Sequence, residues 1–212
     1  VASGNVVLWR HRPIGAGQVK YSAHMGTIIW HLALALIAAS CVTTLANACT
    51  TVYLHRALSH RALAVKPLAA VMFRTAIWVT TGIQPRQWVA VHRKHHAFTD
   101  VEGDPHSPVL LGWKAVQLKN VALYRRALAD PETVLRYAKD LPEDALDRLF
   151  FRHTKTGLAL GIVILMVILG PWTGLAAAFM HANMYLAGSA AVNALGHRFG
   201  RRPYRNQATN LQ

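Results

Sequence analysis

The stretch "TIIWHLALALIAASCVTTLANACTTVYL", residues 27–54, decides the fold class of this chain. It lies within a longer segment, 21–55, that contains no lysine, arginine, aspartate or glutamate. A helix needs about 20 consecutive apolar residues to cross a bilayer, and this segment is long enough. Residues 21–55 are therefore predicted to form the first membrane span.

A second uncharged segment runs from residue 156 to residue 197, and its 42 residues are too many for one span and suit two. The sequence "GPWTG" at 170–174 interrupts it, and Gly170-Pro171 is typical of a turn. The segment 156–197 is therefore predicted to be a hairpin of two spans. The alternative is a soluble bundle with these helices buried, which their length and apolarity disfavour.

The region between these segments, 55–156, is polar. Residues 68–88 are apolar but interrupted by Arg74 and Pro85, which predicts one interfacial or buried helix and not a span. Residues 130–153 are typical of two short amphipathic helices. The predicted fold is all-α: an integral membrane protein with about three transmembrane helices and a cytoplasmic helical cap, 55–156, in a single domain over 1–212.

The net charge of +14 could indicate a nucleic-acid partner or a membrane topology signal. Sixteen of the 23 lysines and arginines lie in 55–156, four follow His197, and the turn at 170–174 has none. Under the positive-inside rule, the region 55–156 and the tail 198–212 are both cytoplasmic. The basic charge is therefore attributed to topology, and no nucleic-acid partner is expected. Three lysines and arginines precede the first span and would lie outside, which conflicts with the positive-inside rule. A further span upstream would remove this conflict.

Histidines are grouped at the ends of the predicted spans. "HRALSH" follows the first span, "HRKHH" lies in the polar region, and "NALGH" ends the last span. The topology brings all three segments to one membrane surface, although 142 residues separate the first histidine from the last. The candidate site therefore comprises His55, His60, His92, His95, His96, His197 and Asn193.

The spacing of these histidines suits metal binding. On a helix, His92, His95 and His96 lie within an arc of about 100° and can face one site. His55 and His60 are about 140° apart on an ideal α-helix, so they can serve one centre only if the helix frays or bulges between them. Clustered neutral imidazoles bind iron, zinc, copper or nickel, and six of them indicate two metal ions. The remaining histidines are interpreted as membrane-face or interface residues with local hydrogen-bond partners: His24, His31, His153 and His181.

These motifs resemble the membrane fatty-acid desaturases of the acyl-CoA (stearoyl-CoA, delta-9) type. The resemblance rests on "HRALSH" (55–60), "HRKHH" (92–96), "GDPHSP" (103–108) and "NALGHRFGRRPY" (193–204), in the family's order and spacing. It implies an oxygen-dependent desaturase that places a cis double bond, at the delta-9 position, in a saturated acyl chain carried by CoA or a lipid. The electron donor would be a ferredoxin or a b-type cytochrome with its reductase.

The resemblance also implies roles for individual residues. The six histidines above would ligate two iron ions, with dioxygen as co-substrate, and Asn193 would hold one iron through a water. Trp88 matches a family tryptophan near the acyl channel, with an ordinary membrane-interface tryptophan as the alternative. His106 also matches a family position. We interpret it as a residue that stabilises the fold or supports the metal-binding side chains from behind, and not as a ligand.

Three departures from the family pattern accompany the resemblance. The family's final HNxHH box is absent, so the chain is expected to be a fragment, with such a box beyond Gln212. The Arg-Lys pair that follows the Gly-Trp motif in the acyl-CoA enzymes is replaced by Gln117-Leu118, which puts CoA recognition in doubt. A family tryptophan is replaced by Ala190, so the resemblance does not determine where the acyl tunnel bends.

Two other functional classes fit the same residues. One is a membrane diiron hydroxylase of lipids or alkanes, which would give an alcohol where a desaturase gives an alkene. The other is a non-catalytic membrane metal or haem protein, which would show no oxygen-dependent turnover.

Overall fold

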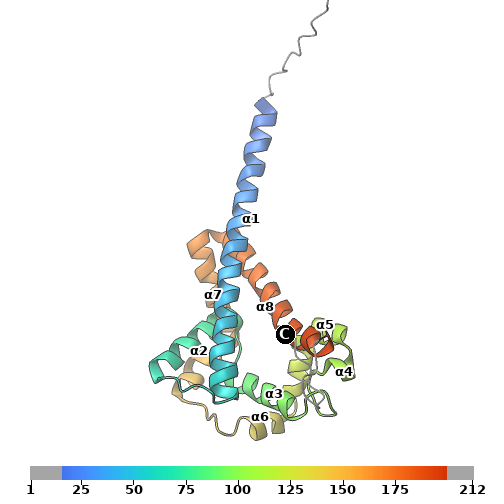
Figure 1. Ribbon diagram of the computed structural model, residues 1–212. Coiled ribbons are helices and arrows are strands. Elements are labelled where there is room, and N and C mark those ends of the chain that lie inside the picture. The colour runs from blue at the N-terminus through green and yellow to red at the C-terminus, as the bar shows by residue number, and fades with distance from the viewer. Residues whose placement is uncertain (1–15, 200–212) are drawn as a thin grey trace, which may run out of the picture.

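The computed structural model describes residues 16–199, and within that range it is helical, without a β-strand (Figure 1). Helix α1 (Ala16–Cys49) continues without a break into the π-helix η1 (Thr50–Ser59). The first of these helices projects beyond the others at its N-terminal end, and the shorter helices gather around the opposite end. Most of the tail 198–212 lies outside the described residues, as does His11.

Eight further elements follow. They are α2 (Pro67–Thr81), α3 (Pro85–Ala97), α4 (Pro108–Leu111), α5 (Trp113–Leu128), α6 (Pro131–Tyr137), η2 (Asp147–Phe151), α7 (Thr154–Leu169) and α8 (Pro171–Phe199). Five of these helices begin at a proline, which lacks the N–H that the first turn leaves unbonded and has a φ suited to a helix. The sequence 130–153 contains two short helices, α6 and η2, as predicted.

The prediction of one helix over 68–88 is wrong. Helix α2 ends at Thr81 because Gly82 adopts a left-handed φ of 63°, and α3 starts at Pro85 after the extended residue Gln84. Arg74, which interrupts the apolar pattern of α2, is buried, and its guanidinium donates to the carboxylates of Asp144 and Asp147 at 2.7 and 2.6 Å. The arginine therefore attaches η2 to α2.

The predicted break in the second apolar segment is confirmed. Helix α7 ends at Leu169, Gly170 has a φ of 84°, and α8 starts at Pro171. The two helices pack against each other, and α7 also packs against α2.

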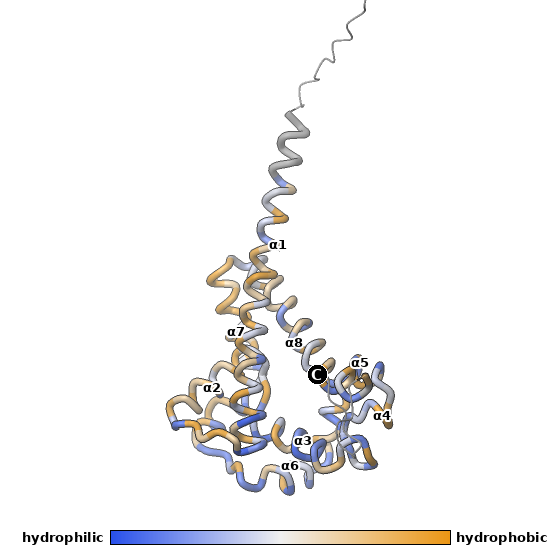
Figure 2. Tube along the Cα trace, viewed as in Figure 1, coloured by the Kyte–Doolittle hydropathy of each residue, from blue (hydrophilic) through white to orange (hydrophobic). Residues whose placement is uncertain are grey.

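Two helices in the described part of the chain are long and apolar enough to cross a membrane: His24–Ser59 and Pro171–His197. Only 17% and 28% of their most apolar windows are buried, so their apolar side chains mostly face outward. Figure 2 shows that apolar residues are frequent along α1 and α7, whereas hydrophilic residues are frequent around α3 and α6. Helix α7 has 16 residues and is about 24 Å long at 1.5 Å per residue, short of the length predicted for a third span.

A face of small residues joins α1 to α8. Ala35, Ala39 and Ala46 of α1 are fully buried, and Thr43, on the same face, hydrogen-bonds to Nδ1 of His181 in α8 at 2.9 Å. The other ring nitrogen of His181 bonds the carbonyl of Thr80 in α2 at 2.9 Å. His181 therefore ties three helices together, in agreement with the interface role expected for it.

Two more polar contacts reach α8, one from α1 and one from η1. His31 bonds Thr173 at 2.9 Å, and Thr50 bonds Tyr185 at 2.8 Å. The expectation that His31 has a local partner is thus confirmed. His24 is exposed, and His153 accepts a bond from the Trp78 indole through its backbone carbonyl at 3.0 Å.

Glycine at position 161 is predicted to be required for the packing of α7 on α2. A Cβ there would overlap the backbone carbonyl of Val79, which cannot move aside as a flexible side chain could. Gly161→Ala is expected to destabilise the protein by about 1–3 kcal/mol, measured by thermal unfolding in detergent. Gly188→Ala in α8 is the control, because a Cβ there has no neighbour within 4 Å. Equal stability of the two variants would contradict this packing.

Candidate metal centre

The first two histidines lie at the π-helix that continues α1: His55 is within it, and His60 caps its C-terminal end. Its i→i+5 hydrogen bonding includes a bond from His60 N to His55 O of 3.0 Å. Residues five apart then lie nearly above one another, and the two Nε2 atoms are 3.3 Å apart. The bulge that the HxxxxH spacing requires is therefore present, and it brings both rings to one side.

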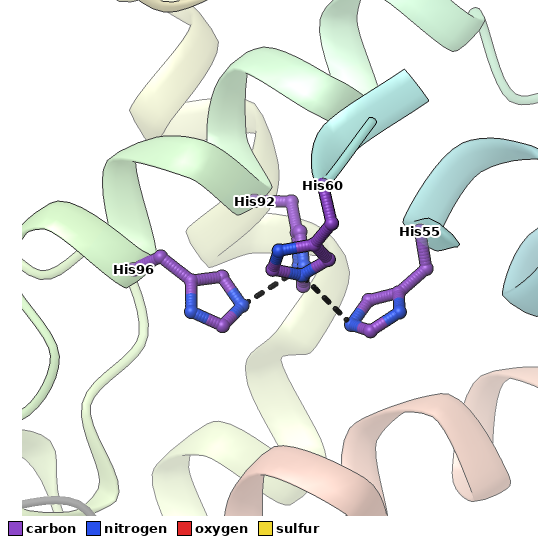
Figure 3. Close-up of side chains that lie close together, drawn as sticks. All are labelled: His55, His60, His92 and His96. Carbon is purple, nitrogen blue, oxygen red and sulfur yellow. Dashed lines mark hydrogen bonds between the residues drawn. The ribbon is translucent and has the colours of Figure 1, made fainter. Parts of the chain in front are cut away.

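Helix α3 supplies two more rings to the same place. His92 and His96 are one turn apart, and their Nε2 atoms are 3.0 Å apart. The ligand nitrogens of His55, His60, His92 and His96 all lie within 4.8 Å of one another (Figure 3). We name these four residues the four-histidine cluster.

His95 faces away from this cluster, so the prediction that His92, His95 and His96 share one direction needs correction. Its ring is 3% exposed, its Nδ1 lies 2.9 Å from a carboxylate oxygen of Asp104, and it stacks on His106 at 4.5 Å. The arc covered by the three side chains is wide enough to span two adjoining sites.

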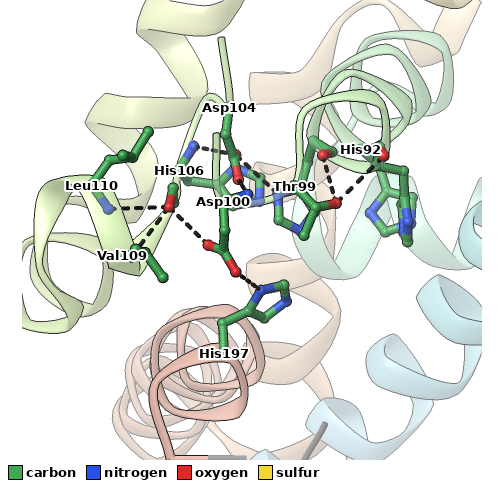
Figure 4. A network of polar contacts seen from close by, with 11 residues as sticks. His92, Thr99, Asp100, Asp104, His106, Val109, Leu110 and His197 are labelled. Atoms are coloured by element: carbon green, nitrogen blue, oxygen red, sulfur yellow. Dashed lines mark hydrogen bonds and ion pairs between the residues drawn. The ribbon is translucent and has the colours of Figure 1, made fainter. Parts of the chain in front are cut away.

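The loop after α3 holds two buried carboxylates beside candidate ligands (Figure 4). Asp104 contacts His95, and Asp100 lies 3.0 Å from Nδ1 of His197 at the end of α8. Asp100 adopts a left-handed φ of 60° and also accepts a bond from the Ser107 hydroxyl at 2.8 Å. The sequence interpretation missed both aspartates, although their four-residue spacing directly after "HRKHH" was visible.

Contacts at Nδ1 leave Nε2 of His95 and of His197 available for a ligand. The two rings are 5.1 Å apart. We name His95 and His197, with their aspartates and His106, the aspartate-supported cluster. It adjoins the four-histidine cluster through the contact between His95 and His96, whose ring centres are 5.6 Å apart. All six candidate histidines therefore gather in one region, as the topology predicted.

Two further candidate residues lie beside these clusters. Trp88 stacks on His92, with ring centres 4.6 Å apart and planes 16° from parallel. Asn193 is half-buried on α8, one turn before His197. Their assignments to the acyl channel and to a metal-bound water stay predictions.

The electrostatics of the site favour the neutral form of three imidazoles, those of His92, His96 and His106. Burial, followed by the neighbouring imidazoles, lowers the pKa of His92 to about 2 and that of His96 to about 4. Burial likewise lowers the pKa of His106 to about 4. The pKa of Asp104 is also lowered: burial would raise it, but hydrogen bonds from His95 and from the backbone N–H of His106 and Asp100 outweigh that effect.

The residues fit transition-metal ions. Four imidazoles with converging nitrogens are a donor set that such ions prefer. In the aspartate-supported cluster, the rings of His95 and His197 each have a carboxylate at Nδ1, which is the usual arrangement around a metal ligand. Nε2 of His106 is buried without a hydrogen-bond partner among the described residues, and it too lies beside this cluster.

Comparison with known proteins supplies the family. A model described as fatty acid desaturase matches residues 29–211, almost the whole chain. The chain belongs to the fatty acid desaturase family. With its two long apolar helices, this membership indicates a membrane protein.

Curated relatives of this desaturase-family chain include proteins of Arabidopsis thaliana and Moorena producens. The delta-9 desaturase-like 2 protein of Arabidopsis thaliana is 29% identical over 62% of this chain and 42% of its own length. The hex-5-enoyl-[acyl-carrier protein] acetylenase of Moorena producens is 29% identical over 86% of this chain and 58% of its own length. The delta-9 acyl-lipid desaturase 2 of Arabidopsis thaliana is 48% identical over 27% of this chain and 19% of its own length. The chain thus spans about half the length of the first two relatives.

The low pKa values predict a pH dependence of the metal-free protein. Unfolded histidines take up a proton near pH 6.5, whereas folded His92 and His96 stay neutral to about pH 4 or below. Below pH 6.5 the unfolded state therefore binds more protons, and the stability of the folded state decreases. Thermal unfolding of the metal-free full-length protein, followed from about pH 7.5 to about pH 5, measures this decrease.

The variant His92→Gln/His96→Gln tests the assignment, because glutamine does not titrate. Its unfolding temperature is expected to depend less steeply on pH than that of the wild type. An identical slope in the variant would show that other groups cause the dependence.

Proposed function

We propose that the full-length protein is an oxygen-dependent fatty acyl desaturase that introduces a cis double bond, at the delta-9 position, into a saturated chain carried by CoA or a lipid. The observation that carries the proposal is the pair of adjoining histidine clusters, which provides two metal positions in a chain of the desaturase family. The relatives' printed names include delta-9 desaturase-like and delta-9 acyl-lipid desaturase proteins, which supports the reaction class.

We assign one iron to the four-histidine cluster and the other to His95 and His197, with Asn193 acting through a water. A bound diiron centre would supply the oxidising chemistry: dioxygen, two electrons and two protons are consumed with two hydrogens from adjacent methylenes, giving an alkene and two waters. The electrons would come from a ferredoxin or a b-type cytochrome with its reductase.

The chain's own residues contribute positioning. Asp104 and Asp100 fix the ring orientations of His95 and His197, so that both direct Nε2 away from the loop. Trp88, stacked on His92, would bound the acyl chain beside the four-histidine cluster. Ala190, which is buried on α8 where acyl-CoA desaturases carry a tryptophan, would leave room along that path.

For the membrane arrangement we propose a single domain with the clusters on the cytoplasmic face. The first span is 21–55, the cytoplasmic cap is 55–156, the two-span hairpin is 156–197, and the tail is 198–212. The clustering of basic residues in 55–156 supports this orientation.

Expression of the full-length gene in a host with a defined lipid profile tests the reaction. New cis-monounsaturated acyl chains, formed only in the presence of oxygen, are expected, and the double-bond position is read by mass spectrometry. An alcohol as the product would identify the hydroxylase, and an unchanged lipid profile with a competent electron donor would contradict both activities.

Single substitutions in the full-length protein test the ligands. Alanine at any of the six histidine positions is expected to abolish desaturation: His55, His60, His92, His95, His96 and His197. Iron analysis should show the loss of one iron and not both, with Asn193→Ala weakening the site of His197 more than the other.

Two histidines outside the clusters serve as controls. His24 is exposed, and His153 bonds Trp78 through a backbone carbonyl that alanine retains. Both alanine variants should keep activity and iron content. Full activity in His95→Ala would rule out the proposed ligand set.

Reporter fusions test the orientation. A reporter at Thr173, at the start of α8, is expected outside, and reporters after Lys94 and after Arg202 are expected in the cytoplasm. The physical reason is the absence of cations from the turn at 170–174. Opposite sides for Lys94 and Arg202 would refute a shared site.

A further inference from the structure

Arg93, between two members of "HRKHH", uses all of its N–H donors. Nε donates to Ser59 O at 3.2 Å. One terminal nitrogen donates to Tyr137 O at 2.9 Å and to an Asp140 oxygen at 2.6 Å, and the other donates to Leu58 O at 2.6 Å and to the second Asp140 oxygen at 3.1 Å. Five hydrogens thus meet five acceptors, which no other side chain could provide.

Two of these acceptors belong to the end of the π-helix. The carbonyls of Leu58 and Ser59 lie in its last turn, where helical carbonyls lack partners along the chain. The next residue is His60, and the chain then turns sharply, with Arg61 at a left-handed φ of 53°. Arg93 therefore holds the segment that places His60, while its own neighbour is His92.

Asp140 connects the two histidine motifs from outside. It lies after α6, and besides Arg93 it accepts a bond from Arg61 at 2.6 Å. The same carboxylate thus contacts the residue after His60 and the residue after His92. The bond from Arg93, with a further bond from Arg61, holds the pKa of Asp140 well below its usual range, so the carboxylate stays charged.

We propose that Arg93 and Asp140 are positioning residues that set the distance of His60 from His92 and His96. This inference rests on the proposed metal centre. A π-helix is rare and has no regular continuation at its end, so its terminal histidine needs an external support. Metal ligands must be held to within about 0.5 Å, and the segment after α6 supplies that support although it contributes no ligand.

The test uses cobalt(II) binding to full-length protein in detergent, followed by the visible absorption of the bound ion. In Asp140→Asn, the dissociation constant of one of the two sites, the four-histidine site, is expected to rise about 10-fold or more. The other site should bind as in the wild type. The readout is metal affinity, which is independent of turnover.

Asp144→Asn is the matched control. Asp144 also binds an arginine through both oxygens, at 2.7 and 2.8 Å, but that arginine is Arg74 of α2, which contacts no histidine of the clusters. This variant should lose thermal stability and keep its cobalt affinities. An equal loss of affinity in both aspartate variants would mean general destabilisation and would overturn the inference.

Arg93→Lys is the second variant, informative if Asp140→Asn does not fold. Lysine keeps the charge but cannot bind two carbonyls and a carboxylate in a planar fork, so the same site should weaken. Wild-type affinity in either Asp140→Asn or Arg93→Lys would overturn the inference and leave the proposed function standing. A wild-type protein that binds no cobalt would overturn both.

Discussion

The candidate centre depends on one change of helical pitch. With α-helical bonding, His55 and His60 would point in directions about 140° apart and could not share a metal. The i→i+5 bonding of η1 realigns them while the helix remains continuous with α1. The long apolar helix therefore leads directly to two candidate ligands, His55 and His60, with no flexible linker between.

A second constraint is the burial of acidic groups beside histidines. Asp100 and Asp104 have no exposed side-chain surface, which would be costly for a charge without partners. Each carboxylate has an imidazole and at least one backbone or hydroxyl donor, so the loop between α3 and α4 is organised around them. The clusters differ accordingly: one is built from helices alone, and the other requires this loop.

Much of the arrangement follows from local patterns. The absence of charge over 21–55 and 156–197, the turn at Gly170-Pro171 and the need for a bulge between His55 and His60 are all properties of short stretches, and the structure contains each of them. The division of "HRKHH" between two clusters could not be predicted, because an arc of about 100° is compatible with one site or two.

The contacts made by acidic residues were also beyond local reasoning. Asp140 binds Arg93 and Arg61, which lie 47 and 79 residues away in the sequence. The numbers of acidic and basic residues do not reveal which of them form ion pairs. The end of α2 was missed because an apolar run through Gly82 has the composition of a continuing helix, whereas the left-handed φ of that glycine stops it.

The alanine face of α1, on the helix that packs against α8, has a consequence for the separation of the two histidine clusters. Helix α1 continues into η1, and α8 carries His197 near its C-terminal end, so the spacing of the two helices affects how far the four-histidine cluster lies from His197. Side chains of one carbon at Ala35, Ala39 and Ala46 allow the backbones to approach closely. The methyl groups of these alanines, which precede His55 by about two turns or more, thereby influence the spacing of the two clusters. Bulkier residues at these positions are expected to move the four-histidine cluster away from His197 without contacting either.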